Sequence, residues 1–261
     1  MIKINAPAPS EWTKYSDIDD AALVCNQIYR EQCGDKNGFP VAVEHFADAC
    51  LEASIEHTFF KVPTGAIVSA RCKPDERDPT RFVIQFNETH REFFKENPAA
   101  HRAVGSHEAG HIVLKHHNKL GCALTPSLFD DFKPEPKCLH KTEWKPEGVT
   151  QEQIEQLRRL AVKGNDEARA ILLDMNNHLE EEWMFWQAEH FVKCFLIPKD
   201  RLLEALETNI DITNWRAIYN LGDEFGVPGS MVVSRLKNLK IIEIGNDKRI
   251  SLGRASRGDL L

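Results

Sequence analysis

The spacing of apolar residues predicts helices in the first part of the chain. Apolar side chains recur three and four positions apart from Ile18 to Tyr29, which is the period of a helix buried on one face, and Gly34 is a typical stop signal. The same pattern predicts a second helix over about residues 41–55 and a third over residues 98–120.

Three short runs rich in β-branched and aromatic residues separate the second and third of these helices. They cover residues 59–62, 65–70 and 81–86, and a Pro-Thr-Gly turn and the polar stretch 73–80 divide them. This order predicts a small antiparallel sheet.

The regular pattern is interrupted between residues 118 and 178. A long loop rich in proline, aromatic and charged residues comes first, and residues 149–173 then return to helical spacing, so the stretch is predicted to be an insertion. Loops of this length in a compact domain are usually functional or mobile. Another helix is predicted from about residue 177 to residue 197, ended by Pro198. Its apolar stripe is predicted to consist of Met184, Ala188, Phe191 and Phe195.

Two short helices and a hairpin are predicted at the C-terminal end. Residues 215–239 show helical spacing on either side of a Gly-Val-Pro-Gly turn at 226–229, and the apolar runs 241–244 and 249–252 flank a second turn. A helix, a turn, a helix and a two-stranded wing together predict a small winged-helix-like module.

Composition favours a globular protein of the cytoplasm. A length of 261 residues suits one large domain, or one domain with a small appendage. No run of apolar residues is long enough to span a bilayer, and the N-terminus lacks the apolar core of a secretory signal. Seven cysteines at scattered spacing, without a CxxC pair, favour a reducing compartment. We therefore expect a cytoplasmic protein without a membrane span.

Charge is unevenly distributed along the chain. The net charge is −7, but residues 231–261 carry seven Lys or Arg against three acidic residues, which leaves +4 on this tail and −11 on the remainder. A basic module on an acidic body could contact a nucleic acid as an activating signal, or an acidic partner. A basic tail that is simply solvated is an equally good interpretation.

The strongest chemical signal is the motif His-Glu-Ala-Gly-His at residues 107–111. Two histidines four positions apart lie on one face of a helix and can reach one Zn²⁺, while the glutamate after the first can activate a water molecule. Apolar residues surround the motif, as a buried helix requires, and Gly110 removes a side chain where another element could approach closely. The motif predicts a zinc hydrolase with His107 and His111 as metal ligands and Glu108 as the catalytic residue.

Three separated blocks resemble the ImmA/IrrE family of zinc metallo-endopeptidases. They are Phe-Val-Ile-Gln-Phe-Asn at 82–87 before the motif helix, Trp-Gln-Ala-Glu-His-Phe with the apolar run to Pro at 186–198, and the segment 221–239 with its Val-Ser-Arg-Leu and final Leu. The resemblance implies an α+β, mostly helical, gluzincin-like core. It also implies that the substrate is a helix-turn-helix transcriptional repressor, cleaved in a DNA-damage, mobile-element or anti-phage response.

One position departs from the family pattern. The resemblance places the third zinc ligand, a glutamate, at position 185, where this chain has Phe185. Glu182 and Glu189 lie one helical turn to either side, and side chains of a helix lean toward its N-terminus, which favours Glu189 as the replacement ligand. Alternatively, Glu189 does not touch the zinc itself but contacts a zinc-bound histidine and orients its ring, and another residue is the ligand.

A cysteine is the other candidate ligand, because a thiolate binds zinc strongly. Cys138 lies in a loop long enough to fold back on the site, where it could act as an inhibitory fourth ligand, whereas Cys122 follows the motif helix so closely that a sharp reversal would be needed. An ordinary loop or buried thiol is the competing interpretation for both. The remaining nearby histidines are predicted to be non-ligands: His116 and His117 on the outgoing helix, His178, and His190.

These observations predict a two-part organisation. Residues 1–198 form a zinc metallopeptidase domain interrupted by the 118–178 insertion, and residues 199–261 form the winged-helix-like module. The predicted function is zinc-dependent cleavage of a helix-turn-helix repressor. The alternative is a catalytically silent regulator that binds DNA or a repressor without cleaving it, and the phenyl ring at position 185 supports this alternative.

Overall fold

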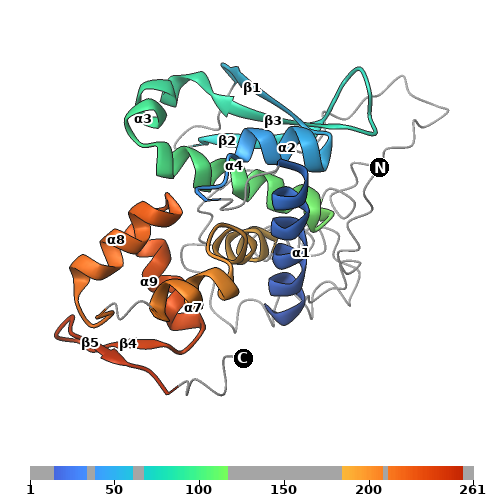
Figure 1. Ribbon diagram of the computed structural model, residues 1–261. Helices are drawn as coiled ribbons and strands as arrows, with labels where there is room; N and C mark the ends of the chain where they lie inside the picture. The colour runs from blue at the N-terminus through green and yellow to red at the C-terminus, as the bar shows by residue number, and fades with distance from the viewer. Residues whose placement is uncertain (1–14, 34–38, 61–67, 117–183, 208–210, 255–261) are drawn as a thin grey trace, which may run out of the picture.

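The protein is a mixed α+β, mostly helical molecule with two small sheets (Figure 1). The computed structural model describes residues 15–33, 39–60, 68–116, 184–207 and 211–254. Besides a helix at residues 184–196 and a short 3-10 turn at Glu88–His90, the described elements are α1 (Tyr15–Cys33), α2 (Val43–Leu51), β1 (Ser54–Thr58), β2 (Ala70–Pro74), β3 (Phe82–Asn87), α3 (Arg91–Glu96), α4 (Pro98–Val113), α7 (Lys199–Glu207), α8 (Trp215–Phe225), α9 (Gly229–Asn238), β4 (Ile242–Ile244) and β5 (Ile250–Leu252).

The larger sheet has the strand order β1-β3-β2. It is a mixed sheet, whereas the sequence analysis predicted an antiparallel one. Strand β3 is parallel to β1 and antiparallel to β2. All six residues of β3 are buried, as expected of a central strand, and this strand was predicted within one residue of its bounds. The prediction of strand direction was wrong because apolar spacing identifies strands but does not determine how they pair.

The first strand also differs from the sequence prediction. Helix α2 ends at Leu51, where Glu52 adopts a left-handed conformation with φ of 51°, so the predicted helix is about four residues too long. The strand that follows is Ser54–Thr58, and Phe59 and Phe60 lie outside it. The sequence of β1 lacks apolar alternation, and its strand geometry comes from pairing with β3.

Helix α4 lies at the centre of the fold. The sheet and α2 cover one side of it, and the helix at residues 184–196 crosses the other side (Figure 1). Gly110 permits this crossing, because a Cβ atom there would lie 3.0 Å from the ring of Phe191 and 3.5 Å from the backbone of Ala188. The close approach predicted at Gly110 is therefore confirmed. The predicted apolar stripe of helix 184–196 is also buried: Met184, Ala188, Phe191 and Phe195.

The C-terminal elements follow the predicted order. Helices α8 and α9 are joined by a turn in which Gly226 adopts a left-handed conformation with φ of 62°, and β4 and β5 form an antiparallel hairpin. Buried residues of these elements, such as Leu236 and Ile242, belong to the same apolar core as Ile18 of α1. The boundary proposed at residue 198 stays a prediction.

In the part of the chain that the structure describes, each helix is too short or too polar to cross a bilayer.

Candidate functional site

The two histidines of the motif lie one turn apart on α4 and direct the same ring nitrogen toward each other. His107 Nε2 and His111 Nε2 are 3.1 Å apart. Two nitrogens that each lie about 2.0–2.1 Å from one tetrahedral Zn²⁺ are separated by about 3.4 Å. The separation of 3.1 Å is slightly shorter than this value, and a small movement of either ring would let the two imidazoles share a zinc ion.

Glu108 lies on the buried side of α4, between the motif histidines and the sheet. Its side chain is 4% exposed, and the backbone N–H of Cys72 in β2 donates a hydrogen bond to the carboxyl group. Burial raises the pKa of Glu108 to about 8, although the hydrogen bond from Cys72 acts in the opposite direction. Its Oε2 has no hydrogen-bond partner among the described residues. A buried carboxyl group with an uncommitted oxygen is suited to exchange a proton with a reacting group.

His116 contacts the motif, although the sequence predicts that it leaves on the outgoing helix. Helix α4 ends at Val113, and Lys115 adopts a left-handed conformation with φ of 56°. This turn brings His116 Nδ1 to 2.8 Å from His111 Nδ1, and its Nε2 lies 2.9 Å from Oε1 of Gln187. The predicted end of this helix was wrong. The helical spacing of apolar residues continues beyond Val113, but the left-handed conformation of Lys115 ends the helix before that spacing does.

Phe185 lies beside the candidate zinc ligands, as the family resemblance implies. Its ring centroid is 4.7 Å from that of His107. Position 185 thus faces the site, but with a hydrocarbon ring that cannot bind a metal.

Glu189 lies one turn further along, and its carboxylate is 3.5 Å from the ammonium group of Lys193. The structure therefore pairs Glu189 with Lys193, and the ligand atoms of Glu189, His107 and His111 are not gathered into one cluster. The role of Glu189 as third ligand stays a prediction. The other candidates, Glu182, Cys122 and Cys138, lie outside the described residues, as do His117 and His178.

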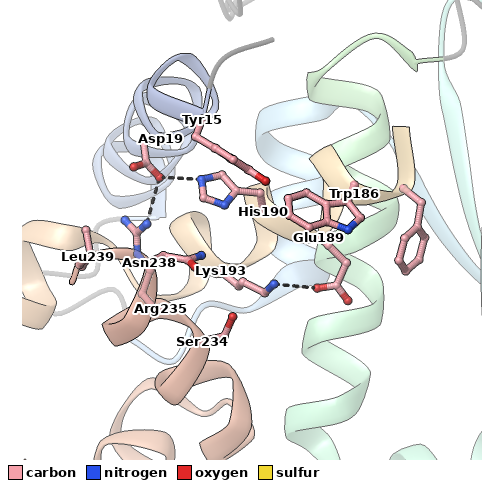
Figure 2. A pocket seen from close by; sticks show the side chains of 11 residues that line it. Tyr15, Asp19, Trp186, Glu189, His190, Lys193, Ser234, Arg235, Asn238 and Leu239 are labelled. Atoms are coloured by element: carbon pink, nitrogen blue, oxygen red, sulfur yellow. Dashed lines mark hydrogen bonds and ion pairs between the residues drawn. The ribbon is translucent and has the colours of Figure 1, made fainter. Parts of the chain in front are cut away.

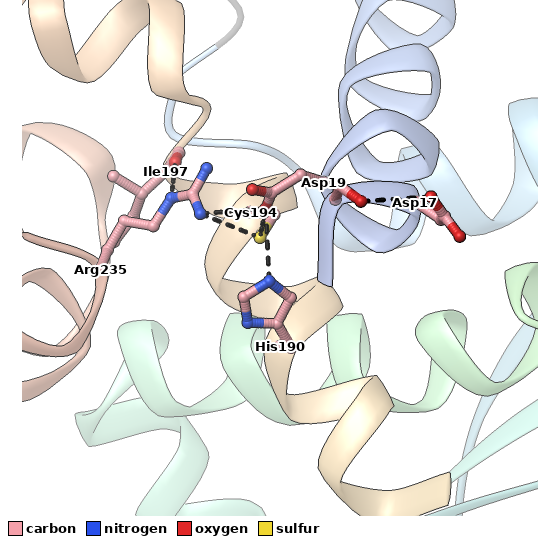
Figure 3. Close-up of polar contacts among 7 residues, drawn as sticks. Asp17, Asp19, His190, Cys194, Ile197 and Arg235 are labelled. Atoms are coloured by element: carbon pink, nitrogen blue, oxygen red, sulfur yellow. Dashed lines mark hydrogen bonds and ion pairs between the residues drawn. The ribbon is translucent and has the colours of Figure 1, made fainter. Parts of the chain in front are cut away.

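A second cluster of potential metal ligands lies where α1, helix 184–196 and α9 meet (Figure 3). Ligand atoms of Asp19, His190 and Cys194 all lie within 4.8 Å of one another, which is a geometry that can hold a metal ion. The guanidinium of Arg235 is already in this cluster: its Nη1 lies 3.0 Å from Asp19 Oδ1 and 3.1 Å from Cys194 Sγ. Arg235 therefore supplies the positive charge that a metal would supply.

Burial and the contacts within this second cluster shift the pKa values of Asp19 and Cys194. Burial by itself raises the pKa of Asp19, but the contacts with His190, Arg235 and Cys194 outweigh it and lower that pKa to about 2. Burial keeps the pKa of the Cys194 thiol well above its usual range, despite the neighbouring guanidinium. A protonated thiol is a poor metal ligand and a poor nucleophile. We interpret the cluster as an ion-pair network that joins three helices.

A cavity of about 660 Å³ opens beside both clusters (Figure 2). Phe185 and Glu189 line it on the side of the zinc motif, while Asp19 and Arg235 line it on the other side. Tyr15 and the largely exposed Trp186 add aromatic surface near its opening. The cavity adjoins the motif through Phe185, whose ring packs against that of His107.

The basic tail has less free charge than its sequence suggests. Arg235 is 2% exposed and paired with Asp19, and Arg249 and Arg254 lie within ion-pair distance of Asp247 and Glu243 in the hairpin. Within residues 231–254, the exposed lysines without an ion pair among the described residues are Lys237, Lys240 and Lys248. A nucleic-acid contact by this module stays a prediction.

Comparisons with known proteins leave the function open. No protein-family model matches the chain, and no curated protein matches it. Among solved structures, the chain is similar to a Mycobacterium tuberculosis transcriptional regulator, with 13% sequence identity and a TM-score of 0.40. The match covers 93% of this chain and 70% of that chain. A likeness at this distance does not assign an activity.

Proposed function

We propose that the protein is a zinc-dependent endopeptidase with a gluzincin-like core and a C-terminal winged-helix-like module. The observation that carries the proposal is the convergence of His107 Nε2 and His111 Nε2, 3.1 Å apart, beside the buried carboxyl group of Glu108. This arrangement has the ligand type, the ligand spacing and the acid–base group that zinc peptidases use.

In this mechanism, His107 and His111 would hold the metal through their Nε2 atoms, which face each other. Zinc, when bound, supplies the Lewis acidity that polarises a scissile carbonyl and makes water a nucleophile at neutral pH. Glu108 accepts the proton of the attacking water and then donates it to the departing amine. The atom that can take part in both transfers is Oε2, which has no hydrogen-bond partner among the described residues.

We propose a helix-turn-helix transcriptional repressor as the substrate. The support comes from the three sequence blocks that resemble the ImmA/IrrE family, and from the order of α8, α9 and the β4-β5 hairpin, which is that of a winged-helix-like unit. The cavity beside Phe185 offers room for an extended segment of the repressor.

The test uses the full-length chain and the repressor encoded beside its gene. Elemental analysis of the purified protein is expected to find stoichiometric zinc, and incubation with the repressor is expected to yield defined fragments. Glu108→Gln should keep the zinc and the fold but lower the cleavage rate by about 10²-fold or more, because the proton acceptor is lost while the shape is preserved.

Glu92→Gln is the matched control, because Glu92 is exposed on α3, where it pairs with Lys95. It should cleave at the wild-type rate. Full cleavage by Glu108→Gln, or a chain that takes up no zinc when the metal is added, would refute the proposal.

A second function is supported by the ring of Phe185, which lies against His107 where the family carries a metal ligand. With that ligand missing, the chain could act as a regulator that binds the repressor or DNA without cleaving it. In this case the wild type and Glu108→Gln would bind the repressor equally, and neither would produce fragments.

A further inference from the structure

Two buried side chains next to the motif have no part in the mechanism above. His116 is fully buried and Gln187 is 5% exposed, and polar groups at such positions are usually engaged in hydrogen bonds. Their contacts run in a line from helix 184–196 to α4: Gln187 Oε1 to His116 Nε2 at 2.9 Å, and His116 Nδ1 to His111 Nδ1 at 2.8 Å. The line ends on the ring nitrogen of His111 that faces away from His107.

We propose that Gln187 and His116 are positioning residues that decide which nitrogen of His111 carries the ring hydrogen. This inference rests on the proposed function, because it gives both residues a role toward zinc. An amide oxygen only accepts hydrogen bonds, so His116 must carry its hydrogen on Nε2. The Nδ1 of a neutral His116 then accepts, and His111 Nδ1 donates to it.

The consequence for His111 is a defined metal-binding form. With its hydrogen on Nδ1, the ring has a lone pair on Nε2, and this atom is the one that lies 3.1 Å from His107 Nε2. A histidine that binds a metal through one nitrogen commonly donates its other N–H to a neighbouring acceptor, which fixes the orientation of the ring. Here the neighbouring acceptor is a second histidine, whose own state is set by an amide.

The backbone arranges this line at two points. The left-handed conformation of Lys115 turns the chain after α4, so that His116 returns to His111. The absence of a side chain at Gly110 lets helix 184–196 approach α4, where the backbone of Ala188 would lie 3.5 Å from a Cβ atom. Ala188 follows Gln187 directly, so this approach also brings the amide within reach of His116.

The amide group of Gln187 could also lie the other way round, and this orientation predicts the opposite ring hydrogens. Gln187 Nε2 has no hydrogen-bond partner among the described residues, so a half-turn of the amide would exchange one unpartnered atom for the other. The half-turn would place a donor against His116 Nε2 and reverse the hydrogens of both rings. His111 would then carry its hydrogen on Nε2 and could not bind zinc through that atom. Glutamate at position 187 removes this alternative, because an ionised carboxylate only accepts.

The first experiment reads the ring hydrogens directly in the metal-free, full-length protein. Long-range ¹H–¹⁵N correlation NMR on protein with labelled histidine distinguishes the two neutral forms of each ring. The expected result is the Nδ1–H form for His111 and the Nε2–H form for His116. Finding His111 mainly in the Nε2–H form would overturn the proposal.

The second experiment measures Zn²⁺ affinity by competition with a chelating dye, without any substrate. Gln187→Met keeps the size of the side chain but removes the acceptor, and it should weaken zinc binding by about 10-fold to 100-fold and mix the two forms of His111. Gln187→Glu should restore wild-type affinity and the Nδ1–H form. Gln85→Met, which replaces an equally buried amide on β3, should change neither.

These results separate the inference from the proposed function. If Gln187→Met leaves the zinc affinity and the form of His111 unchanged, the inference is wrong, whatever the activity of the enzyme. If the expected forms and affinities are found but no repressor is cleaved, the inference holds and the proposed peptidase activity is wrong.

Discussion

Two clusters of ionisable side chains contact helix 184–196, and they differ in the source of their positive charge. In the cluster of Asp19, His190 and Cys194, the chain itself provides a cation, the buried guanidinium of Arg235. In the motif cluster, two imidazole nitrogens converge at 3.1 Å, a separation suited to a metal ion that they share.

This difference shows why proximity of ligand types is a weak criterion for a metal site. Asp19, His190 and Cys194 meet the distance criterion, yet a guanidinium lies 3.0 Å from the carboxylate and 3.1 Å from the sulfur. The useful criterion is whether the chain already supplies a positive charge to the potential ligands. Where it does, as Arg235 does here, we interpret the cluster as a network that stabilises the fold.

The largest expected effect is on zinc content, which should depend on the motif cluster and not on the cluster of Asp19, His190 and Cys194. His111→Ala should lose stoichiometric zinc, because a single histidine cannot hold the ion, whereas Cys194→Ala should retain it. Elemental analysis of both purified variants measures the difference. Zinc that persists in His111→Ala and disappears in Cys194→Ala would reverse the assignment of the two clusters.

The next effect concerns stability. Arg235→Met should lower the free energy of unfolding by about 2 kcal/mol, because it removes the guanidinium that pairs with Asp19 and donates a hydrogen bond to the carbonyl of Ile197, and zinc content should not change. Denaturant unfolding monitored by circular dichroism measures the loss. Arg249→Met is the control, since that side chain is 88% exposed, and it should be neutral. An equal effect of both substitutions would contradict the role given to Arg235.

A smaller effect is expected from giving the motif cluster a third metal ligand, in the form of a carboxylate. Phe185→Glu places the ligand of the resembled family next to His107 and should tighten zinc binding by about tenfold, which is about 1.4 kcal/mol. Phe185→Gln has the same size without the charge and should not reproduce the gain. Titration of the metal-free proteins with Zn²⁺ measures both. Equal affinity in the two variants would show that position 185 does not serve the metal.

The smallest effect is the pH dependence of the second cluster. The pKa of Asp19 is about 2 in the folded chain and near 3.8 when unfolded, so its stabilising contribution is complete above about pH 4 and is lost as the pH falls toward 2. Because the side chain is 36% exposed, we expect this contribution to be only about 1 kcal/mol. The stability difference between the wild type and Asp19→Asn should therefore shrink between pH 5 and pH 2.5, as measured by denaturant unfolding. A difference that is constant across this range would contradict the ion pair.

Local spacing predicted much of the molecule. The turn between α8 and α9, the β4-β5 hairpin, strand β3 and the close approach of another element at Gly110 were all predicted from patterns within a few residues. The same holds for His107 and His111, because a helical period of about 3.6 residues places side chains four apart on one face whatever the rest of the chain does. The sequence by itself therefore determined that these two rings could meet.

The groups that complete each cluster come from distant parts of the chain, and they are brought together by the packing of the whole fold. Asp19 and Arg235 are separated by 216 positions, and nothing in the local spacing of either residue indicates the other, although the four-residue spacing of His190 and Cys194 could have drawn attention to that helix. His116 reaches His111 because of a left-handed residue at Lys115 that helical periodicity does not reveal. Pairings of this kind depend on how helices cross and where the backbone turns, and these are set by the packing of the whole core rather than by neighbours along the chain.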